Sequence, residues 1–188
     1  MIQTNWYIIT GGPSTGKSKT IDHLAFLGCN IRPEAARILI DNEMSKGKTL
    51  QEIRGNETKF EENILNIKTL SEEKTNVDEI IFWERGMQDS IVYLKRCLCD
   101  FSKATLESKK RKYKGVFLLD ILPKYEKDYA RTEDREEAKN IHEALFKIYL
   151  DYGYDVIRVP VMCISDRANF ILDKIGYKSS SQYIINHH

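Results

Sequence analysis

The segment Tyr7–Ser18, which reads YIITGGPSTGKS, constrains the fold of this chain more than any other segment. An apolar run ends at two glycines, and a lysine and a serine follow after a short gap. A short apolar run that stops at glycine is typical of a strand buried on both faces of a parallel sheet. The residues after Lys17 have apolar side chains at helical spacing, and Gly28 is a good helix stop. The segment therefore predicts a strand, a glycine loop and a helix in immediate succession.

The glycine loop follows the pattern G-x-x-x-x-G-K-[ST] of a P-loop. Glycines allow backbone N–H groups to turn inward around phosphate oxygens, and the helix that begins near Gly16 points the positive end of its dipole at the same anion. Lys17 can reach the β- and γ-phosphates of a nucleotide, and the Ser18 hydroxyl can bind Mg²⁺. Because a chance glycine turn would not require a flanking strand and helix, we predict that the loop holds a nucleoside triphosphate. The predicted nucleotide-binding residues of this segment are Gly11, Gly12, Pro13, Ser14, Thr15, Gly16, Lys17, Ser18 and Thr20.

Strands and helices alternate along the rest of the chain. Short apolar runs predict four more strands, at 29–32, 79–83, 116–119 and 156–159. Helical patterns occupy the segments 34–43, 86–98, 134–152 and 166–175. The stretch 44–76 is polar and helix-prone with breaks at Gly47 and Gly55, the segment 105–112 is expected to be a helix end, and 123–133 is a predicted loop. This alternation predicts one α/β domain over residues 1–188, with a parallel sheet between two layers of helices.

Composition limits the class of protein and its partners. The net charge is +1, so anion binding has to come from local geometry rather than from a basic surface. The four cysteines form no CxxC pair and no zinc spacing, which favours a reducing, cytoplasmic location. No stretch is apolar enough to span a membrane, and residues 1–10 lack the pattern of a signal peptide. The basic run KKRKYK at 109–114 stands alone in a neutral chain, so we do not expect nucleic acid as a partner.

Charged residues follow two of the predicted strands. Glu84 and Arg85 come after the strand at 79–83, at the carboxyl edge of the sheet, where open α/β sheets bind ligands. A carboxylate there can hold Mg²⁺ or accept a proton from an attacking hydroxyl, and an arginine can bind phosphate. Glu34 and Arg37 follow the second strand, three residues apart on one helix face. Simple ion pairs are the alternative at both places, and the spacing leaves that alternative open.

The segment DYARTEDR, 128–135, precedes a long helix and carries Asp128, Arg131 and Arg135. Arginines on a closing loop can stabilise the charge of a transferring phosphate, although a solvated run of charges is equally consistent with the pattern. Two other features are interpreted as structural. Phe60 and Ile64 keep the spacing of a packed helix face, and His142 lies on the packed face of the helix at 134–152.

Together these motifs resemble those of P-loop kinases. The chain is similar to a family of small ATPases that includes bacterial ribosylnicotinamide kinase domains and, more distantly, to thymidylate and deoxynucleoside kinases. The resemblance covers nearly the whole chain, through the segments TGGPSTGKS, IRPEAAR, WERGMQDSIVYL, RTEDREEA and SDRANFIL. It implies a three-layer α/β fold with a five-stranded parallel sheet in the order 2-3-1-4-5 and a lid over the site.

The resemblance also implies roles for individual residues. The expected catalytic residues are Lys17, Glu34, Glu84, Arg85 and Arg131. The expected acceptor-binding residues are Glu34, Arg37, Arg85 and Asp89. Ser18 and Glu84 would hold Mg²⁺, and Arg135 would join the nucleotide site from the lid. Deoxynucleoside kinases use the acid after the second strand as the base, which favours Glu34, while Glu84 remains the alternative.

The resulting expectation is an ATP- and Mg²⁺-dependent transfer of a phosphoryl group to a hydroxyl of a small molecule, with nucleosides and ribosyl compounds as candidates. The main alternative is a nucleotide-hydrolysing regulatory module that acts through a protein or lipid partner. A kinase of nucleic-acid ends is a third hypothesis, carried only by the basic run and the P-loop. A kinase requires a cavity beside the γ-phosphate, whereas a switch does not. The acceptor, the choice of ATP or GTP, and the oligomeric state, a homodimer included, stay open.

Overall fold

The central sheet has five parallel strands in the part of the chain that the computed structural model describes, residues 1–123 and 134–177. The strands are β2 (Trp6–Thr10), β3 (Asn30–Arg32), β4 (Ile81–Glu84), β6 (Gly115–Leu119) and β7 (Val156–Val159). Their spatial order is β3-β4-β2-β6-β7, and every neighbouring pair is parallel. Numbered along the chain within this sheet, the order is 2-3-1-4-5, so the predicted fold class is confirmed.

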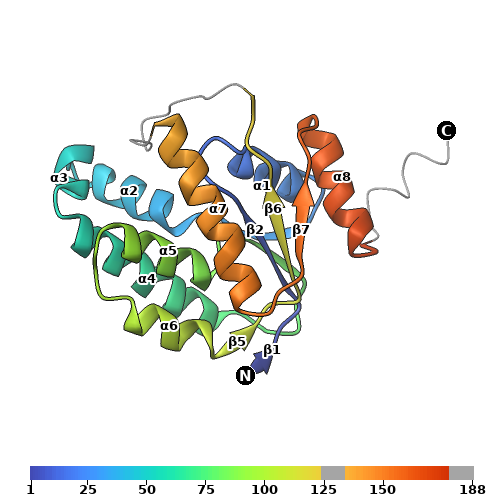
Figure 1. The fold of residues 1–188 in the computed structure, drawn as a ribbon, viewed down its shortest axis with the longest axis horizontal. Helices are drawn as coiled ribbons and strands as arrows, with labels where there is room; N and C mark the ends of the chain where they lie inside the picture. Colours follow the sequence, from blue (N-terminus) through green and yellow to red (C-terminus); the bar gives the residue numbers. More distant parts are fainter. Residues whose placement is uncertain (124–133, 178–188) are drawn as a thin grey trace.

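Helices cover both faces of this sheet (Figure 1). They are α1 (Lys17–Phe26), α2 (Ala35–Ser45), α3 (Leu50–Arg54), α4 (Glu57–Lys74), α5 (Met87–Arg96), α6 (Ser102–Ser108), α7 (Arg135–Asp151) and α8 (Ile164–Lys174). The alternation of β2 explains the two layers, since Ile8 is buried with residues of α5 and α7 while Ile9 is buried with residues of α1 and α8. The strand is therefore apolar throughout because both of its faces are covered.

The polar stretch 44–76 folds as the glycine breaks predict. The helix α2 ends at Ser45, and Gly47 follows with a positive φ of 89°. The short α3 begins with a capping box between Thr49 and Glu52, and Gly55 is its C-cap. Then α4 packs against α2 and α5. This arrangement places α2, α3 and α4 beside the carboxyl end of β4, where Figure 1 shows them grouped at one side of the sheet.

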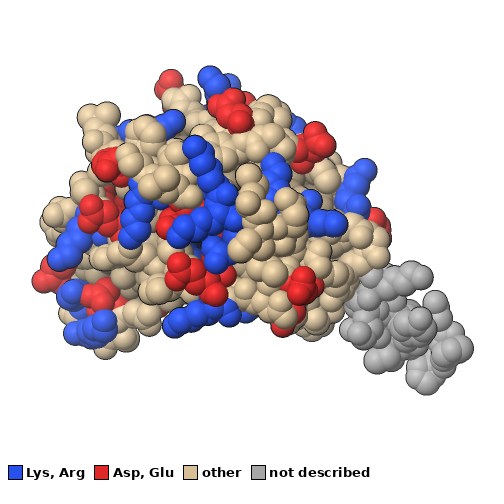
Figure 2. Space-filling model, turned by 90° about the horizontal axis from the view of Figure 1, so that it is seen from below, with Lys and Arg blue, Asp and Glu red and all other residues tan. Residues whose placement is uncertain are grey.

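A second, two-stranded sheet was not predicted. It joins β1 (Ile2–Gln3) to β5 (Arg111–Lys112), so the expected helix end at 105–112 is wrong beyond Ser108. Two-residue strands have too few side chains to create a recognisable pattern. The Lys112 ammonium donates to the carbonyls of Tyr152 and Gly153 at 2.9 Å each, so part of the basic run is used in packing. Figure 2, which views the molecule from below Figure 1, shows basic side chains interspersed with acidic and other residues.

The segment before α7 contains the predicted loop and lid. Residues 124–133, with Asp128 and Arg131, lie outside the described residues. The helix α7 begins after Asp134, whose side chain accepts a hydrogen bond from the Glu137 backbone N–H at 2.9 Å, as the predicted helix start requires. No helix in the described ranges has the length and hydrophobicity needed to cross a membrane.

Candidate active site

The loop between β2 and α1 needs glycine at both of its ends. Gly11 and Gly16 have positive φ angles of 140° and 79°, which L-residues rarely adopt. A Cβ on Gly11 would also lie 2.8 Å from the Leu119 carbonyl oxygen, so this position has no room for a side chain. Ser14, in the middle of the loop, has a positive φ of 57° as well. The two glycines of the predicted pattern therefore lie where the backbone conformation of this loop requires glycine.

The lysine and serine of the loop are held by short contacts. The buried Lys17 ammonium donates to the Gly12 carbonyl at 2.8 Å and to the Thr15 hydroxyl oxygen at 3.3 Å. These two bonds hold the positive charge against the loop. The Ser18 hydroxyl donates to Glu84 Oε1 at 2.8 Å, so the first turn of α1 is linked to the end of β4. The predicted side chains thus meet where a phosphate chain would lie.

Two residues that were not among the predicted site residues hold the loop from behind. His142 of α7 accepts a hydrogen bond at Nδ1 from the Gly12 backbone N–H at 3.3 Å, and Arg167 of α8 donates to the Thr15 carbonyl at 2.6 Å. Both side chains are buried. Burial lowers the pKa of His142, which favours the neutral ring that this acceptor role requires. A Cβ on Gly12 would lie 2.6 Å from the Ala138 carbonyl, so α7 packs directly against the loop.

At the end of β4, Arg85 connects three parts of the site. Its backbone has a positive φ of 67°, a strained conformation for a residue other than glycine. Its Nε donates to Glu34 Oε1 at 2.5 Å, and its Nη1 donates to Asp89 Oδ1 at 3.1 Å and to the Gly11 carbonyl at 3.3 Å. Arg85 therefore ties the start of α2 to the P-loop and to α5.

Asp89 differs from its prediction. It has an exposed fraction of 0% and does not line the pocket, so it is not placed to touch an acceptor. Besides Arg85, its carboxylate accepts hydrogen bonds from the Thr10 hydroxyl at 2.7 Å, the Gly86 backbone N–H at 3.0 Å and the Tyr149 hydroxyl at 2.6 Å. The physical reason is its position in the first turn of α5, which turns the side chain toward β2 and α7. Asp89 therefore holds the Arg85 side chain in place and does not face the pocket.

The two candidate carboxylates have opposite electrostatic environments. Burial raises the pKa of Glu84, and the neighbouring charge of Glu34 raises it further. Burial would also raise the pKa of Glu34, but the charges of Arg85 and Lys17 outweigh this effect and lower it to about 2. Glu34 is therefore ionised at any physiological pH, and Glu84 is the carboxyl group of the two that takes up a proton more readily.

Ser18 and Glu84 fit a Mg²⁺ ion. A hydroxyl and a carboxylate 2.8 Å apart beside the P-loop are hard oxygen ligands, and Mg²⁺ is usually held by one or two such groups together with phosphate oxygens and water. In residues 1–123 and 134–177, no group of three or more His, Cys, Asp or Glu side chains could by itself hold a metal ion. A bound dication would also offset the repulsion between Glu84 and Glu34.

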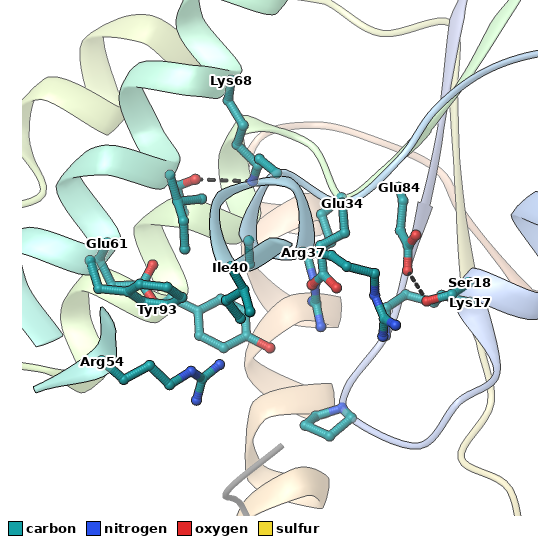
Figure 3. Close-up of a pocket in the computed structure, with 17 residues that line it drawn as sticks. Lys17, Ser18, Glu34, Arg37, Ile40, Arg54, Glu61, Lys68, Glu84 and Tyr93 are labelled. Atoms are coloured by element: carbon teal, nitrogen blue, oxygen red, sulfur yellow. Dashed lines mark hydrogen bonds and ion pairs between the residues drawn. The ribbon is translucent and has the colours of Figure 1, made fainter. Parts of the chain in front are cut away.

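An open pocket extends from the P-loop between α2, α4 and α5 (Figure 3). The space between its walls is about 780 Å³ and includes a part that is open to solvent. Seven of the predicted functional residues line it, namely Pro13, Lys17, Ser18, Glu34, Arg37, Glu84 and Arg85. The structure therefore brings the three motifs that are separate in sequence to one cavity.

Comparison with known proteins identifies the family. The sequence profile of the AAA domain family matches residues 6–167. The chain belongs to the AAA domain family. No curated protein matches its sequence.

Solved structures similar to this AAA domain include NadR and a deoxyadenosine kinase, each with a bound ligand. The NadR protein in complex with NR has a TM-score of 0.68 at 12% identity, over 94% of this chain and 51% of that chain. The NadR protein in complex with NAD and AMP-PNP has a TM-score of 0.66 at 15% identity, over 93% of this chain and 50% of that chain. Deoxyadenosine kinase from M. mycoides, with dCMP and a flexible dCDP bound, has a TM-score of 0.62 at 15% identity, over 91% of this chain and 98% of that chain. This chain thus spans about half the length of NadR. The solved structures confirm the predicted fold, and the family model identifies the AAA domain family.

The remaining predicted residues of this AAA domain lie at various distances from the pocket. Pro13 lines it. The Thr20 hydroxyl instead donates to the Gly16 carbonyl at 3.0 Å, a hydrogen bond within the first turn of α1. Arg135 is exposed at the start of α7 and is not among the residues that line the pocket. Arg131 lies outside the described residues.

One wall of the pocket was not predicted as part of a site in this AAA domain. It is formed by Arg54 of α3, by Phe60, Glu61, Ile64 and Lys68 of α4, and by Ser90 and Tyr93 of α5. The helical spacing of Phe60 and Ile64 was a correct signal for packing. The spacing could not reveal that the same face of α4 also borders a cavity, because that depends on where α2 and α5 are placed.

Proposed function

We propose that this protein transfers the γ-phosphoryl group of ATP, with Mg²⁺, to a hydroxyl group of a small molecule bound in the pocket beside the P-loop. The observation that carries the proposal is the pocket itself, which places Glu34 and Arg85 next to Lys17 and leaves a cavity beyond them. An enzyme that delivered phosphate only to water would not need this additional cavity. The ligands named for the NadR and deoxyadenosine kinase structures support nucleosides and ribosyl compounds as the first acceptors to test.

On the phosphate side, the P-loop backbone and Lys17 bind the β- and γ-phosphates, and Ser18 and Glu84 hold Mg²⁺. The ion neutralises charge on the phosphate oxygens when it is bound. Lys17 is fixed near the Gly12 carbonyl, so its ammonium needs only a short movement to follow the charge that develops on the leaving group.

On the acceptor side, Glu34 accepts a hydrogen bond from the acceptor hydroxyl and directs its oxygen at the γ-phosphorus. A bond forms between that oxygen and the phosphorus, the bond to the β–γ bridging oxygen breaks, and ADP leaves with the electron pair. With a pKa of about 2, Glu34 is a weak base, so its main role is orientation, and the hydroxyl proton passes late in the reaction through Glu34 to solvent. Arg85, held by Asp89 and the Gly11 carbonyl, stabilises the charge on the transferring group.

The test is ADP formation from Mg-ATP with a panel of nucleosides, nucleoside monophosphates and nicotinamide riboside, with a reaction lacking acceptor as control. Products are identified by mass spectrometry, and the assay is repeated with GTP. Strong stimulation by one acceptor, with the phosphorylated acceptor as product, is the expected result. Slow hydrolysis that is indifferent to every acceptor would instead support the regulatory module that acts through a protein or lipid partner.

A further inference from the structure

The pocket has two ends with different chemistry. Figure 3 shows Lys17, Ser18 and Glu84 at one end and Glu61 and Arg54 at the other. The first end is fully used by the proposed phosphoryl transfer. The second end extends past Glu34 and is lined by residues that have no role in that reaction. The side chains at this end would therefore contact the part of the acceptor that does not react.

Glu61 is the acidic group of this second end. It lies in the first turns of α4 with an exposed fraction of 9%, and it lines the pocket. Its carboxylate has no hydrogen-bond partner among the residues that the structure describes. A buried carboxylate without a hydrogen bond is costly, since it has lost water and gained no donor. A donor that enters the pocket would therefore be bound strongly at this point.

The nearest cations are held by other groups. The Lys68 ammonium, further along α4, donates to the Gly86 carbonyl at 2.6 Å and to the Ser90 hydroxyl oxygen at 3.0 Å. The Arg85 guanidinium is bonded to Glu34 and to Asp89. These bonds engage both cations with other groups. The third cation that acts on Glu61 is Arg54, whose guanidinium lies over the Phe60 ring, 5.0 Å from its centroid. The Glu61 carboxylate therefore lines the cavity without a hydrogen bond to any of the three.

The walls around Glu61 are apolar and partly aromatic. Phe60 and Ile64 of α4, Ile40 of α2 and Tyr93 of α5 line this part of the pocket. The guanidinium groups of Arg54 and Arg85 lie over the Phe60 and Tyr93 rings, each 5.0 Å from the ring centroid. A wall of aromatic, guanidinium and aliphatic groups suits a planar ring. A ring placed here would lie between these walls and present its edge to Glu61.

We propose that Glu61 is a specificity residue that selects acceptors whose distal end is a planar ring with an N–H donor, such as an exocyclic amine or amide, over acceptors with a carbonyl or carboxylate at that position. The inference rests on the proposed function, in that the acceptor occupies this pocket. It adds the chemical class of the acceptor to that function.

Glu61 also gives the selection a pH dependence. Burial raises the pKa of Glu61 to about 7, although the charges of Lys68, Arg85 and Arg54 oppose the rise. The titratable and charged groups around Glu61 are Lys68 and Glu57 on α4, Arg85 at the end of β4, Arg54 on α3 and Cys97 after α5. The carboxyl group is ionised above its pKa, and the ionised form accepts a hydrogen bond best. The KM for an N–H acceptor should therefore fall as the pH rises from 6 to 8.

The experiment uses acceptor pairs of matched size that differ at one ring substituent: cytidine and uridine, adenosine and inosine, and nicotinamide riboside and nicotinic acid riboside. Values of kcat/KM are measured for the wild type, for Glu61→Gln and for Glu62→Gln, an exposed neighbour on the same helix. Because hydrogen bonds to charged groups are strong, we expect the wild type and Glu62→Gln to prefer the amine or amide member of at least one pair by about tenfold or more. Glu61→Gln should lose most of that preference and the pH dependence of KM, with an unchanged KM for ATP.

Calorimetric titration of the same pairs in the presence of AMP-PNP separates this inference from the proposed function. Selective, Glu61-dependent binding without transfer would contradict the kinase activity and support the acceptor class. Transfer with the same preference in the wild type and Glu61→Gln, a preference for the carbonyl or carboxylate members, or no binding of any pair would overturn the role of Glu61. A wild-type KM for the N–H acceptor that stays constant between pH 6 and 8 would overturn it as well, without the need for a variant.

Discussion

The two ends of the pocket are built in different ways. The phosphate end is built mainly from one continuous stretch, residues 11–18, which contains Lys17, and Glu84 joins it from the end of β4. The acceptor end is assembled from α2, α3, α4 and α5, which are separate in the chain and meet only in the folded protein. A local stretch has to keep its residue types to keep its shape. An assembled wall can change side chains without loss of the fold, so we infer that the acceptor end carries the specificity of this protein.

The largest effect is expected at the phosphate end. Lys17→Ala should lower kcat/KM by about a thousandfold, because removal of a preorganised charge at a transferring phosphate has effects of this size. The exposed Lys19→Ala on the same helix is the control and should retain activity. Both variants are compared by thermal unfolding as well as by turnover. Comparable activity in Lys17→Ala and Lys19→Ala would contradict the assignment of the phosphate site.

Arg85→Lys tests the junction between the two ends. The variant keeps the positive charge but cannot reach Glu34, Asp89 and the Gly11 carbonyl together, as the guanidinium does. We expect kcat to fall by about a hundredfold, while nucleotide affinity measured by calorimetry changes only a few-fold.

Arg96→Lys, at the far end of α5, is the matched control for Arg85→Lys and should leave kcat unchanged. A large loss of nucleotide affinity in Arg85→Lys with normal kcat would instead assign Arg85 to the phosphate end alone.

A smaller effect is expected from behind the P-loop. His142→Leu leaves the Gly12 backbone N–H without its partner, and an unpaired buried donor should raise the KM for ATP by about tenfold. His142→Asn, whose side-chain oxygen can take the place of Nδ1, should restore most of the affinity. Equal KM values in the wild type and both variants would show that the contact has no role in nucleotide binding.

His142 also predicts a pH effect of defined sign. Because burial lowers the pKa of His142, the ring stays neutral through the ordinary histidine range and gains a proton only as the pH falls further. A protonated Nδ1 cannot accept from Gly12, so the ATP affinity of the wild type should fall at acidic pH. The His142→Asn variant should lack this step when both proteins are titrated by calorimetry.

The fold and the phosphate end could be predicted because their rules are local. Gly11 and Gly16 are required by positive φ angles, and the apolar strands alternate with helices in the order that the resemblance implies. His142 was correctly interpreted as a packed residue, but its partner Gly12 is 130 positions away, and no local pattern can encode such a contact. The two strands β1 and β5 were missed because each has only two residues.

The acceptor end was predicted only in part, again for physical reasons. Glu34, Arg37 and Arg85 follow strands and had to reach the carboxyl edge of the sheet. The resemblance implied that Asp89 binds the acceptor, but burial and four hydrogen bonds turn it into a support for Arg85. Glu61 carries no signal at all in sequence, since an acidic residue on a polar helix is ordinary until the surrounding helices bury it.

The central claim is that both ends of the pocket serve one reaction, in which the γ-phosphoryl group passes from ATP to a bound acceptor. The most direct measurement follows ATP labelled at the γ-phosphate, with Mg²⁺ and the best acceptor of the panel at saturation, and separates labelled acceptor from labelled inorganic phosphate. We predict that nearly all of the released label is found in the acceptor. Release of the label as inorganic phosphate, at a rate that the acceptor does not change, would contradict the account.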